Sequence, residues 1–429
     1  MERVIEKAKF LKGRINPPAD KSISHRAIMF ASLAKGISRI RNFLWAKDPL
    51  STLNAMRALK VEIETNFEGE ILIHGKGLNS LKEPEDVIDC GNSGTTIRLL
   101  SGILSGQPFL SILTGDESLR GRPMRRVINP LRMMGADIMA RADDNFPPIA
   151  IKGSKLRGID YKLDIASAQV KSAILLAGLF AEGVTTVTEP QKSRDHTERM
   201  LKGMGVDIQI KDNTITLNPP ERLNPFDIHI PNDFSSAAFF IAAATVVPNS
   251  EVLIENVCLN PTRTGFLRVV KEMGAQIETV NLHEQSGEVV GDIICKTTSS
   301  LKSVTVKGDI IPVLIDEFPV LCVLATQAEG QTIIRDAKEL RVKESDRIKA
   351  MATELKKMGA DIEELEDGVI VRGPTKLKGS EVYSYKDHRV AMALSVAGLI
   401  AEGSTTVQDA HCVDISFPEF YNLLQRLQR

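Results

Sequence analysis

Aromatic residues are scarce in this 429-residue chain: they make up 5% of it, with a single tryptophan, Trp45. Proteins that stack bases or sugars on aromatic side chains need such residues at their binding surfaces. Positive charge is not in excess either, because 54 Lys and Arg face 55 Asp and Glu, for a formal net charge of −1. A broad nucleic-acid interface or a polybasic membrane surface is therefore not indicated.

Cysteine is also rare, with five residues, and long apolar runs are missing. The cysteines are widely spaced without any CxxC pair, which is typical of reduced thiols in a cytosol and not of a disulfide framework or zinc site. The first residues carry charges but no apolar signal-peptide core. The longest apolar stretches, Ser236–Pro248 and Val390–Ala401, are too short to span a bilayer. We expect a soluble cytoplasmic protein, and the lack of an obvious exposed apolar stripe favours a monomer.

What the chain does have is an internal repeat of about 70 residues. Each copy starts with polar or charged residues, continues as an Ala- and Leu-rich helix, ends near Gly or Pro, and leads into a β-branched strand. The copies begin at Lys21, Gly91, Ser167, Asp233, Asp316 and Asp387. These helices have few charges on any face after their first turn, so we expect them to be buried on nearly all sides.

A second, amphipathic helix follows in most copies and ends in a Met-Gly turn before another strand. Asp346–Met358 is an example, with Ile348, Met351 and Leu355 on one stripe, and such helices are expected outside the buried ones. The last copy lacks a final strand, which a strand within Arg3–Phe10 would supply. The repeats predict an α/β protein of two three-repeat domains, over residues 14–230 and over residues 1–13 plus 231–429. The Pro- and Asn-rich stretch Pro219–Pro231 marks the boundary, and the active site is expected in the cleft between the domains.

The starts of the buried helices are dense in Ser, Thr, Asn and Gln, which is typical of N-caps. Capping alone does not require the cations that accompany them. These cations are Lys21, Arg26, Arg98, Lys171, Arg347 and Arg389. Helix N-termini and Arg side chains suit phosphates and carboxylates, so the pattern predicts a site for a small molecule with several negative charges. The basic segments around Arg122 and from Glu339 fit this site, although a solvated loop and a charged helix start remain alternatives for them.

Several other catalytic motifs are absent from the sequence. It contains no GxxxxGK[ST], no GxGxxG after a strand and no HExxH, and its seven His residues show no metal-ligand spacing. The segment SAQVK separates Ser and Lys by four positions instead of the three of SxxK, so a serine acyl-enzyme is not supported.

Eight motifs occur in one order along the chain: KSISHRA from Lys21, GNSGTTIRLL from Gly91, LRGRPM from Leu119, SAQVKSA from Ser167, SRDHTERML from Ser193, IDEFPVL from Ile315, LRVKESDR from Leu340 and DHRVAM from Asp387. Together they resemble the motifs of 5-enolpyruvylshikimate-3-phosphate (EPSP) synthases, the 3-phosphoshikimate 1-carboxyvinyltransferases. The resemblance runs from about residue 12 to the C-terminus, and the SAQVK and RDHTE forms resemble bacterial class II members.

This resemblance implies an enolpyruvyl transferase fold of two domains, each of three βαβαββ repeats in an inside-out α/β barrel arrangement. It implies transfer of the enolpyruvyl group of phosphoenolpyruvate to the 5-hydroxyl of 3-phosphoshikimate, with release of phosphate by addition and elimination. The reaction belongs to the shikimate pathway of chorismate and aromatic amino-acid synthesis. No metal or organic cofactor is implied.

The resemblance also assigns residues to roles. The implied catalytic residues are Asp316, Glu344 and Lys21. The residues implied to bind 3-phosphoshikimate are Lys21, Ser22, Arg26, Ser167, Gln169, Arg194, Asp316 and Lys343. The residues implied to bind phosphoenolpyruvate are Lys21, Gly94, Arg122, Gln169, Arg347 and Arg389. Which of the three catalytic residues moves each proton stays open at this point.

Some positions depart from the family pattern. Ala168 stands where many members have a second Ser, and Ile415 stands where one branch has a Lys near phosphoenolpyruvate. Gly94 is kept where Ala confers glyphosate tolerance, so inhibition by glyphosate in competition with phosphoenolpyruvate is expected. Asp195 and Glu198 in DHTE read as a capping box.

Two alternatives stay open on sequence. One is enolpyruvyl transfer to UDP-N-acetylglucosamine, although that enzyme usually carries a reactive Cys where this chain has Arg120-Gly121-Arg122. The other is a non-catalytic anion-binding protein on the same fold, against which the presence of both Asp316 and Glu344 argues.

Overall fold

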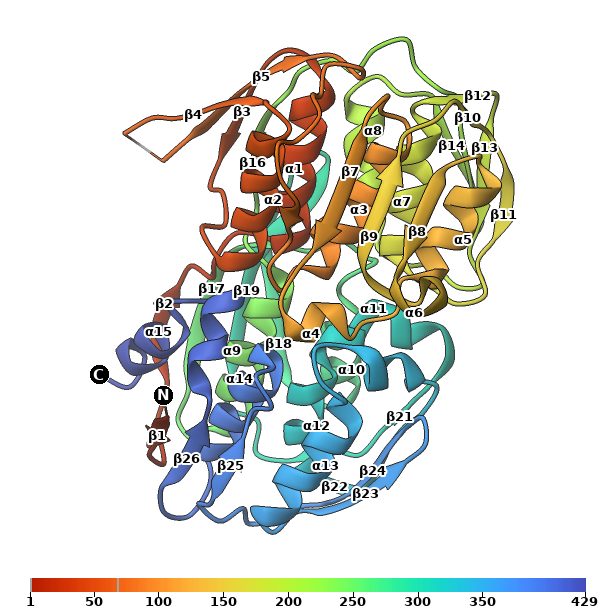
Figure 1. Ribbon diagram of the computed structural model, residues 1–429. Coiled ribbons are helices and arrows are strands. Elements are labelled where there is room, and N and C mark those ends of the chain that lie inside the picture. Colours follow the sequence, from red (N-terminus) through yellow and green to blue (C-terminus); the bar gives the residue numbers. More distant parts are fainter. Residues whose placement is uncertain (1, 68) are drawn as a thin grey trace. The chain divides into compact units, whose positions relative to one another are not determined.

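The computed structural model describes residues 2–67 and 69–429 of the chain (Figure 1). The chain divides into two compact units, which we call the N-terminal unit (Ala19–Ile230) and the C-terminal unit (Met1–Pro18 with Pro231–Arg429). Residues 14–18 were expected in the N-terminal domain but lie in the C-terminal unit. The reason is that β2 (Lys12–Ile15) pairs in parallel with β17 (Glu251–Cys258).

The centre of the N-terminal unit is formed by long helices that are buried on nearly every side, as their sequences predict. They are α1 (Lys21–Leu33), α3 (Gly94–Ser105) and α7 (Ala168–Gly178). They lie side by side (Figure 1). The packing of α3 on α7 is close at Gly102, where a Cβ would come within 2.2 Å of the Ala173 carbonyl oxygen. Glycine is therefore required at this crossing.

Amphipathic helices and small sheets surround these central helices. The outer helices are α2 (Lys47–Ala58), α4 (Glu117–Arg120), α5 (Arg125–Met133), α6 (Arg141–Asp144) and α8 (His196–Gly203). In spatial order, the sheets are β16 (Asp227–His229), β3 (Lys35–Arg41), β5 (Ile71–Lys76) and β4 (Glu62–Thr65); β6 (Ile88–Asp89), β7 (Leu110–Thr114), β9 (Phe146–Lys152) and β8 (Asp137–Ala140); β11 (Asp160–Lys162), β13 (Thr185–Thr188), β15 (Thr214–Leu217) and β14 (Ile208–Lys211); and the pair β10 (Leu156–Arg157) and β12 (Ala181–Glu182).

The stretch expected to mark the domain boundary, Pro219–Pro231, contains the last residue of the N-terminal unit, Ile230, and also a strand of that unit. Its strand β16 pairs in parallel with β3, with Ile228 opposite Ile40. Both side chains are buried, so apolar contact across the pair holds the end of the N-terminal unit against its beginning. A Pro-rich composition indicated a break in the chain, but it did not exclude a short edge strand.

The C-terminal unit repeats the plan. Its buried helices are α9 (Phe234–Val246), α12 (Phe318–Thr326) and α14 (His388–Gly398), and its other helices are α10 (Gly265–Glu272), α11 (Ile311–Leu314), α13 (Arg347–Lys357) and α15 (Phe420–Arg426). Its sheets, in spatial order, are β18 (Gln276–Gln285), β19 (Glu288–Lys296), β17 and β2; β20 (Leu301–Lys302), β22 (Ala328–Ile334), β24 (Gly368–Gly373) and β23 (Asp361–Leu365), with β21 (Thr305–Val306) also on β22; and β1 (Arg3–Ile5), β26 (Thr405–Gln408) and β25 (Glu381–Tyr383). The apolar stripe expected on α13 is confirmed, since Ile348, Met351 and Leu355 are fully buried.

Both ends of the chain join this unit. Strand β1 pairs antiparallel with β26, with Val4 opposite Thr406, which confirms the predicted N-terminal strand that completes the last repeat. The C-terminal helix α15 contributes Phe420, whose ring lies 5.6 Å from that of Phe240 on α9. Among the described helices of the chain, none combines the length and apolarity needed to cross a bilayer.

Candidate active site

The first turns of the buried helices in the N-terminal unit are capped by side chains. Each cap oxygen accepts a hydrogen bond from a backbone amide: Asp20 from Ile23 at 2.9 Å, Ser93 from Thr96 at 3.1 Å and Ser167 from Val170 at 3.4 Å. Capping therefore accounts for these residues. It does not account for the neighbouring Lys21, Ser22, Gly94 and Gln169, which the family resemblance assigns to substrate. The Ser167 hydroxyl accepts in its cap and retains a proton to donate.

Lys21 begins α1, and its Nζ lies 3.0 Å from Oδ2 of Asp48 on α2. The two side chains are 17% and 8% exposed, so this ion pair is largely shielded from water. Behind it, Nδ1 of His25 lies 2.6 Å from Oγ1 of Thr52. Burial, together with the charges of Lys21 and Arg26, holds the pKa of His25 well below its usual value. His25 is therefore a neutral part of the core at pH 7, whereas Lys21 carries the charge at this helix start.

Two arginines converge on the start of α3. A Cβ at Gly94 would lie 2.9 Å from Nη1 of Arg98 and 3.4 Å from Nη1 of Arg122. Nη1 of Arg98 donates to Oε1 of Gln169 on α7 at 2.5 Å, and Nη2 of Arg122 donates to Oδ1 of Asn92 at 2.7 Å. The structure thus brings Gly94, Arg122 and Gln169 together, as the resemblance implies. Positive charge beside a helix N-terminus suits an anion.

Arg26 lies deeper than its predicted role in substrate binding suggests. It is 3% exposed, and it donates to Oγ1 of Thr197 at 2.7 Å, to Oγ of Ser172 at 2.9 Å and to the carbonyl oxygen of Ser22 at 3.0 Å. It therefore ties the first turn of α1 to α7 and α8, directly below Ser22. Arg194 is half-buried in the loop that precedes α8.

Lys171 is a cation at a helix start whose ammonium group binds buried carboxylates, so it is not available to a substrate anion. Its Nζ lies 2.8 Å from Oε2 of Glu189 and 2.6 Å from Oε1 of Glu198, and all three side chains are at most 3% exposed. The capping box expected in DHTE is therefore wrong. Glu198 binds Lys171, and the Asp195 side chain makes no capping hydrogen bond and pairs with Arg199 at 2.8 Å. The buried lysine attracts Glu198 more strongly than a backbone amide would.

The C-terminal unit gathers a second set of charged groups around the guanidinium of Arg347, the first residue of α13. This side chain is 1% exposed and contacts three carboxylates: Nε lies 2.8 Å from Oδ2 of Asp387, Nη2 lies 2.7 Å from Oε2 of Glu344, and Nη1 lies 3.3 Å from Oδ1 of Asp316. Arg389, in the first turn of α14, places Nη2 3.5 Å from Oδ2 of Asp316. The two predicted catalytic carboxyl groups thus share one guanidinium.

These contacts fix the charge states. Burial alone would lower the pKa of Arg347, but the carboxylates of Asp387, Glu344 and Asp316 raise it above its usual value. Burial alone would raise the pKa of Asp387, but Arg347 holds it below its usual range. Both groups are charged at pH 7. The sequence showed Asp387 only as a helix start, because the motif DHR carries an N-cap residue and an Arg without showing that the cap also holds Arg347.

Lys343 is half-buried at the end of the 3-10 segment Lys338–Val342. Burial lowers its pKa to about 8, against the attraction of Asp316 and Glu339. The ammonium group is therefore charged at neutral pH and loses its proton only slightly above it.

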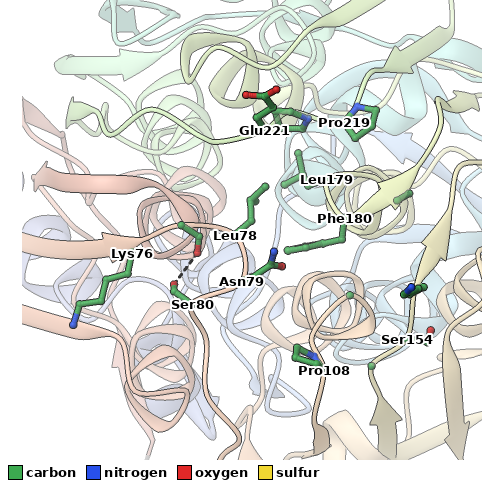
Figure 2. Close-up of a pocket in the computed structure, with 16 residues that line it drawn as sticks. Lys76, Leu78, Asn79, Ser80, Pro108, Ser154, Leu179, Phe180, Pro219 and Glu221 are labelled. Atoms are coloured by element: carbon green, nitrogen blue, oxygen red, sulfur yellow. Dashed lines mark hydrogen bonds between the residues drawn. The ribbon is translucent and has the colours of Figure 1, made fainter.

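A cavity of about 970 Å³ opens elsewhere in the N-terminal unit (Figure 2). It lies where α3 and α7 end, next to Gly106 and Leu179, and Lys76, Asn79 and Phe180 also line it. The described residues of its wall include none of those predicted to bind substrate. The volume of this cavity is thus no guide to the active site.

The chain has the enolpyruvyl transferase fold. Its α/β units each contain three repeats, and their buried helices begin in clusters of Arg, Lys and carboxylates. The structure is similar to that of NikO, an enolpyruvyl transferase from Streptomyces tendae, with a TM-score of 0.78 at 18% identity over 99% of this chain and 96% of that one. This likeness concerns the fold.

The chain belongs to the EPSP synthase (3-phosphoshikimate 1-carboxyvinyltransferase) family, whose model matches residues 5–424. It is 70% identical to the 3-phosphoshikimate 1-carboxyvinyltransferase of Thermodesulfovibrio yellowstonii over the full length of both. The EPSP synthase structure from Acinetobacter baumannii is similar with a TM-score of 0.88, at 46% identity over 99% of this chain and 98% of that one. The activity is therefore 3-phosphoshikimate 1-carboxyvinyl transfer in the shikimate pathway, and phosphoenolpyruvate and 3-phosphoshikimate are the family's substrates.

Proposed function

We propose that the charged and polar residues described above bind these substrates and carry out the transfer. The set assigned to phosphoenolpyruvate is Lys21, Gly94, Arg122, Gln169, Arg347 and Arg389. The set assigned to 3-phosphoshikimate is Lys21, Ser22, Arg26, Ser167, Gln169, Arg194, Asp316 and Lys343. The observation that carries the proposal is the shared guanidinium of Arg347, which contacts both Asp316 and Glu344. It links an anion-binding group to an acid and a base within one unit.

Phosphoenolpyruvate carries a phosphate and a carboxylate, and forked guanidinium groups bind both well. In the structure, Arg347 is already neutralised by carboxylates. A substrate anion that binds Arg347 therefore competes with Glu344, the more exposed of its closest two partners at 19%. Loss of the guanidinium contact removes a positive charge that favours the Glu344 carboxylate, and so favours the protonated form. Substrate binding itself thus prepares Glu344 to act as an acid.

The transfer then follows from the two carboxyl groups. Asp316 accepts the proton of the 5-hydroxyl while the hydroxyl oxygen attacks C2 of phosphoenolpyruvate, and Glu344 donates its proton to the methylene carbon C3. A tetrahedral adduct forms and its C–O bond to phosphate breaks. The Glu344 carboxylate takes a proton back from C3, which restores the enol ether, and the departing phosphate takes the proton held by Asp316. Lys21, paired with Asp48, is the alternative proton carrier. Paired groups of opposite protonation are the usual device for such acid and base steps.

The assignment of Arg122 is tested by replacing it with Met and following phosphate release. Loss of a charge-assisted contact of about 1.5–3 kcal/mol should raise KM for phosphoenolpyruvate roughly 10- to 100-fold. KM for 3-phosphoshikimate should change little. Arg125→Met is the matched control, because Arg125 is exposed and pairs with Asp143. An equal rise in both KM values would contradict the assignment.

Lys343 should make binding of 3-phosphoshikimate depend on pH. Its pKa of about 8 in the free protein means that the cation is present below that pH and is lost as pH rises through it. We expect kcat/KM for 3-phosphoshikimate to fall roughly tenfold between about pH 8 and about pH 9.5. In Lys343→Arg the side chain stays charged throughout this range, so the fall should disappear. A fall that persists in Lys343→Arg would assign it to another group.

We also propose that glyphosate inhibits the enzyme in competition with phosphoenolpyruvate, since Gly94 leaves the start of α3 open beside Arg98 and Arg122. A monomer in the cytoplasm that acts on small molecules, without nucleic-acid or membrane partners, stays a prediction from the sequence.

A further inference from the structure

Directly after Asp316, a second carboxyl group points into the protein. Glu317 is 2% exposed, and the hydroxyl of Ser235, in the first turn of α9, donates to its Oε1. Ser235 Oγ in turn accepts from Nη2 of Arg263 at 2.7 Å, and the same nitrogen donates to Oδ1 of the cap residue Asp233 at 3.0 Å. Neither Arg263 nor Glu317 has a place in the assigned substrate sets, although both are ionisable and buried.

This buried hydrogen-bond network reaches the proposed active site through Arg389. Nη1 of Arg389 lies 3.9 Å from Oε1 of Glu317 and donates to the carbonyl oxygen of Asp316 at 3.2 Å. Its Nη2 lies 3.5 Å from Oδ2 of Asp316. One guanidinium is thus shared between a buried carboxyl group and the carboxyl group proposed as the base.

The charges around Glu317 come from each element packed against it. Asp316 precedes it, Arg389 faces it from α14, Arg263 faces it from the loop before α10, and Asp233 caps α9 beside Arg263. If Glu317 were neutral, Asp316 would be the remaining ionised carboxylate beside Arg389 among these groups. The guanidinium would then be drawn toward Asp316, where it would stabilise the ionised base and weaken its ability to take a proton.

We propose that Glu317 is a positioning residue for the transfer: held by Ser235 and Arg263, it shares Arg389 with Asp316, so that the guanidinium does not bind the Asp316 carboxylate alone and weaken its ability to accept the hydroxyl proton. The inference rests on the roles proposed above for Asp316 and Arg389. Glu317 contacts no reacting atom in this scheme. It acts through the placement of its two neighbours.

Protonation of Glu317 provides a readout that a purely structural role lacks. Burial raises the pKa of Glu317 to about 7, while Arg389 opposes this shift and Asp316 adds to it. Glu317 is therefore ionised above about pH 7 and neutral below it. The variant Glu317→Gln is neutral at every pH, so it resembles the wild-type protein at low pH and differs from it at high pH.

The test compares kcat for phosphate release in wild type and Glu317→Gln across this range. We expect kcat of the wild type to exceed that of the variant about tenfold at about pH 8.5 and only about twofold at about pH 6. The reason is that the ion pair between Glu317 and Arg389 exists only when Glu317 is ionised. Glu354→Gln is the matched control. Glu354 is fully buried and binds Lys357 and Tyr385, outside the network around Glu317. Any loss of kcat in Glu354→Gln should therefore not vary with pH.

A ratio for Glu317→Gln that does not change with pH would overturn the inference. If that variant does not fold, Ser235→Ala gives the second test. The Ser235 hydrogen bond lowers the pKa of Glu317, so its removal should move the activity change near neutral pH to higher pH, and no movement would overturn the inference. Asp316→Asn distinguishes failure of the proposed active site from failure of the role proposed for Glu317. If Asp316→Asn retains turnover, the proposed active site is wrong. If Asp316→Asn loses turnover and Glu317→Gln does not, only the role of Glu317 is wrong.

Discussion

Asp316→Asn is expected to lose about 10²–10⁴-fold in kcat, the usual contribution of a positioned general base. The carboxylate lies within 3.5 Å of both Arg347 and Arg389, so Asn keeps the shape but can neither take the hydroxyl proton nor balance two guanidinium groups. Because Asp316 is also proposed to hold the hydroxyls of 3-phosphoshikimate, KM for this substrate should rise as well. Phosphate release with both substrates measures the two effects.

The same substitution at Asp309 serves as the control. Asp309 is exposed on the short segment Gly308–Ile310, seven positions earlier in the chain, and Asp309→Asn should retain wild-type kinetics. Thermal unfolding of both variants tests that the fold is intact. A kcat for Asp316→Asn close to that of wild type would show that Asp316 is not the base, and Glu344 and Lys21 would then be the groups to examine.

Lys171→Met is expected to lower the free energy of unfolding by about 3–5 kcal/mol. The lysine is the shared partner of Glu189 and Glu198, and all three side chains are buried. Burial would lower the pKa of Lys171, but the two carboxylates raise it above its usual value. Without the ammonium group, two carboxyl groups lie close together without this counter-charge, and urea unfolding followed by circular dichroism should record the cost.

Lys338→Met is the control for the loss of a lysine ion pair. Lys338 and Glu366 form an equally short contact of 2.6 Å, but both side chains are exposed, so stability should barely change. In Lys171→Met, the second change Glu198→Gln removes one of the two charges and should restore part of the loss. A double variant no more stable than Lys171→Met would show that the loss comes from packing and not from charge.

Much of the fold was predictable because it depends on local pattern. Helices apolar on every face must be buried, and α1, α9 and α14 are buried over nearly their whole length. The stripe on α13 faced the core for the same reason. The Pro- and Asn-rich stretch Pro219–Pro231 includes the end of the N-terminal unit at Ile230, as expected. Its composition did not show strand β16, because pairing of β16 with β3 depends on a partner about 190 positions away.

The candidate site was predicted in part. Gly94, Arg122 and Gln169 were expected together through resemblance to known motifs, and the structure places them within one cluster. Lys171 shows why helix-start cations cannot be assigned by position alone: residue 169 and residue 171 lie in the same first turn of α7 yet point to different neighbours. The side of a helix that a charge occupies depends on what packs against that helix.

The sequence by itself determined the repeat, the buried helices, the family and the chemical types in the site, because these depend on periodicity and on residue identity. Only the tertiary structure decided which charges serve which purpose. Arg347 joins Asp316 and Glu344, Lys171 is enclosed by two carboxylates, and Glu317 faces Arg389 from within the protein. The physical reason is that the energy of a charge depends on its burial and on its neighbours within a few ångströms, and chain folding alone brings those neighbours together.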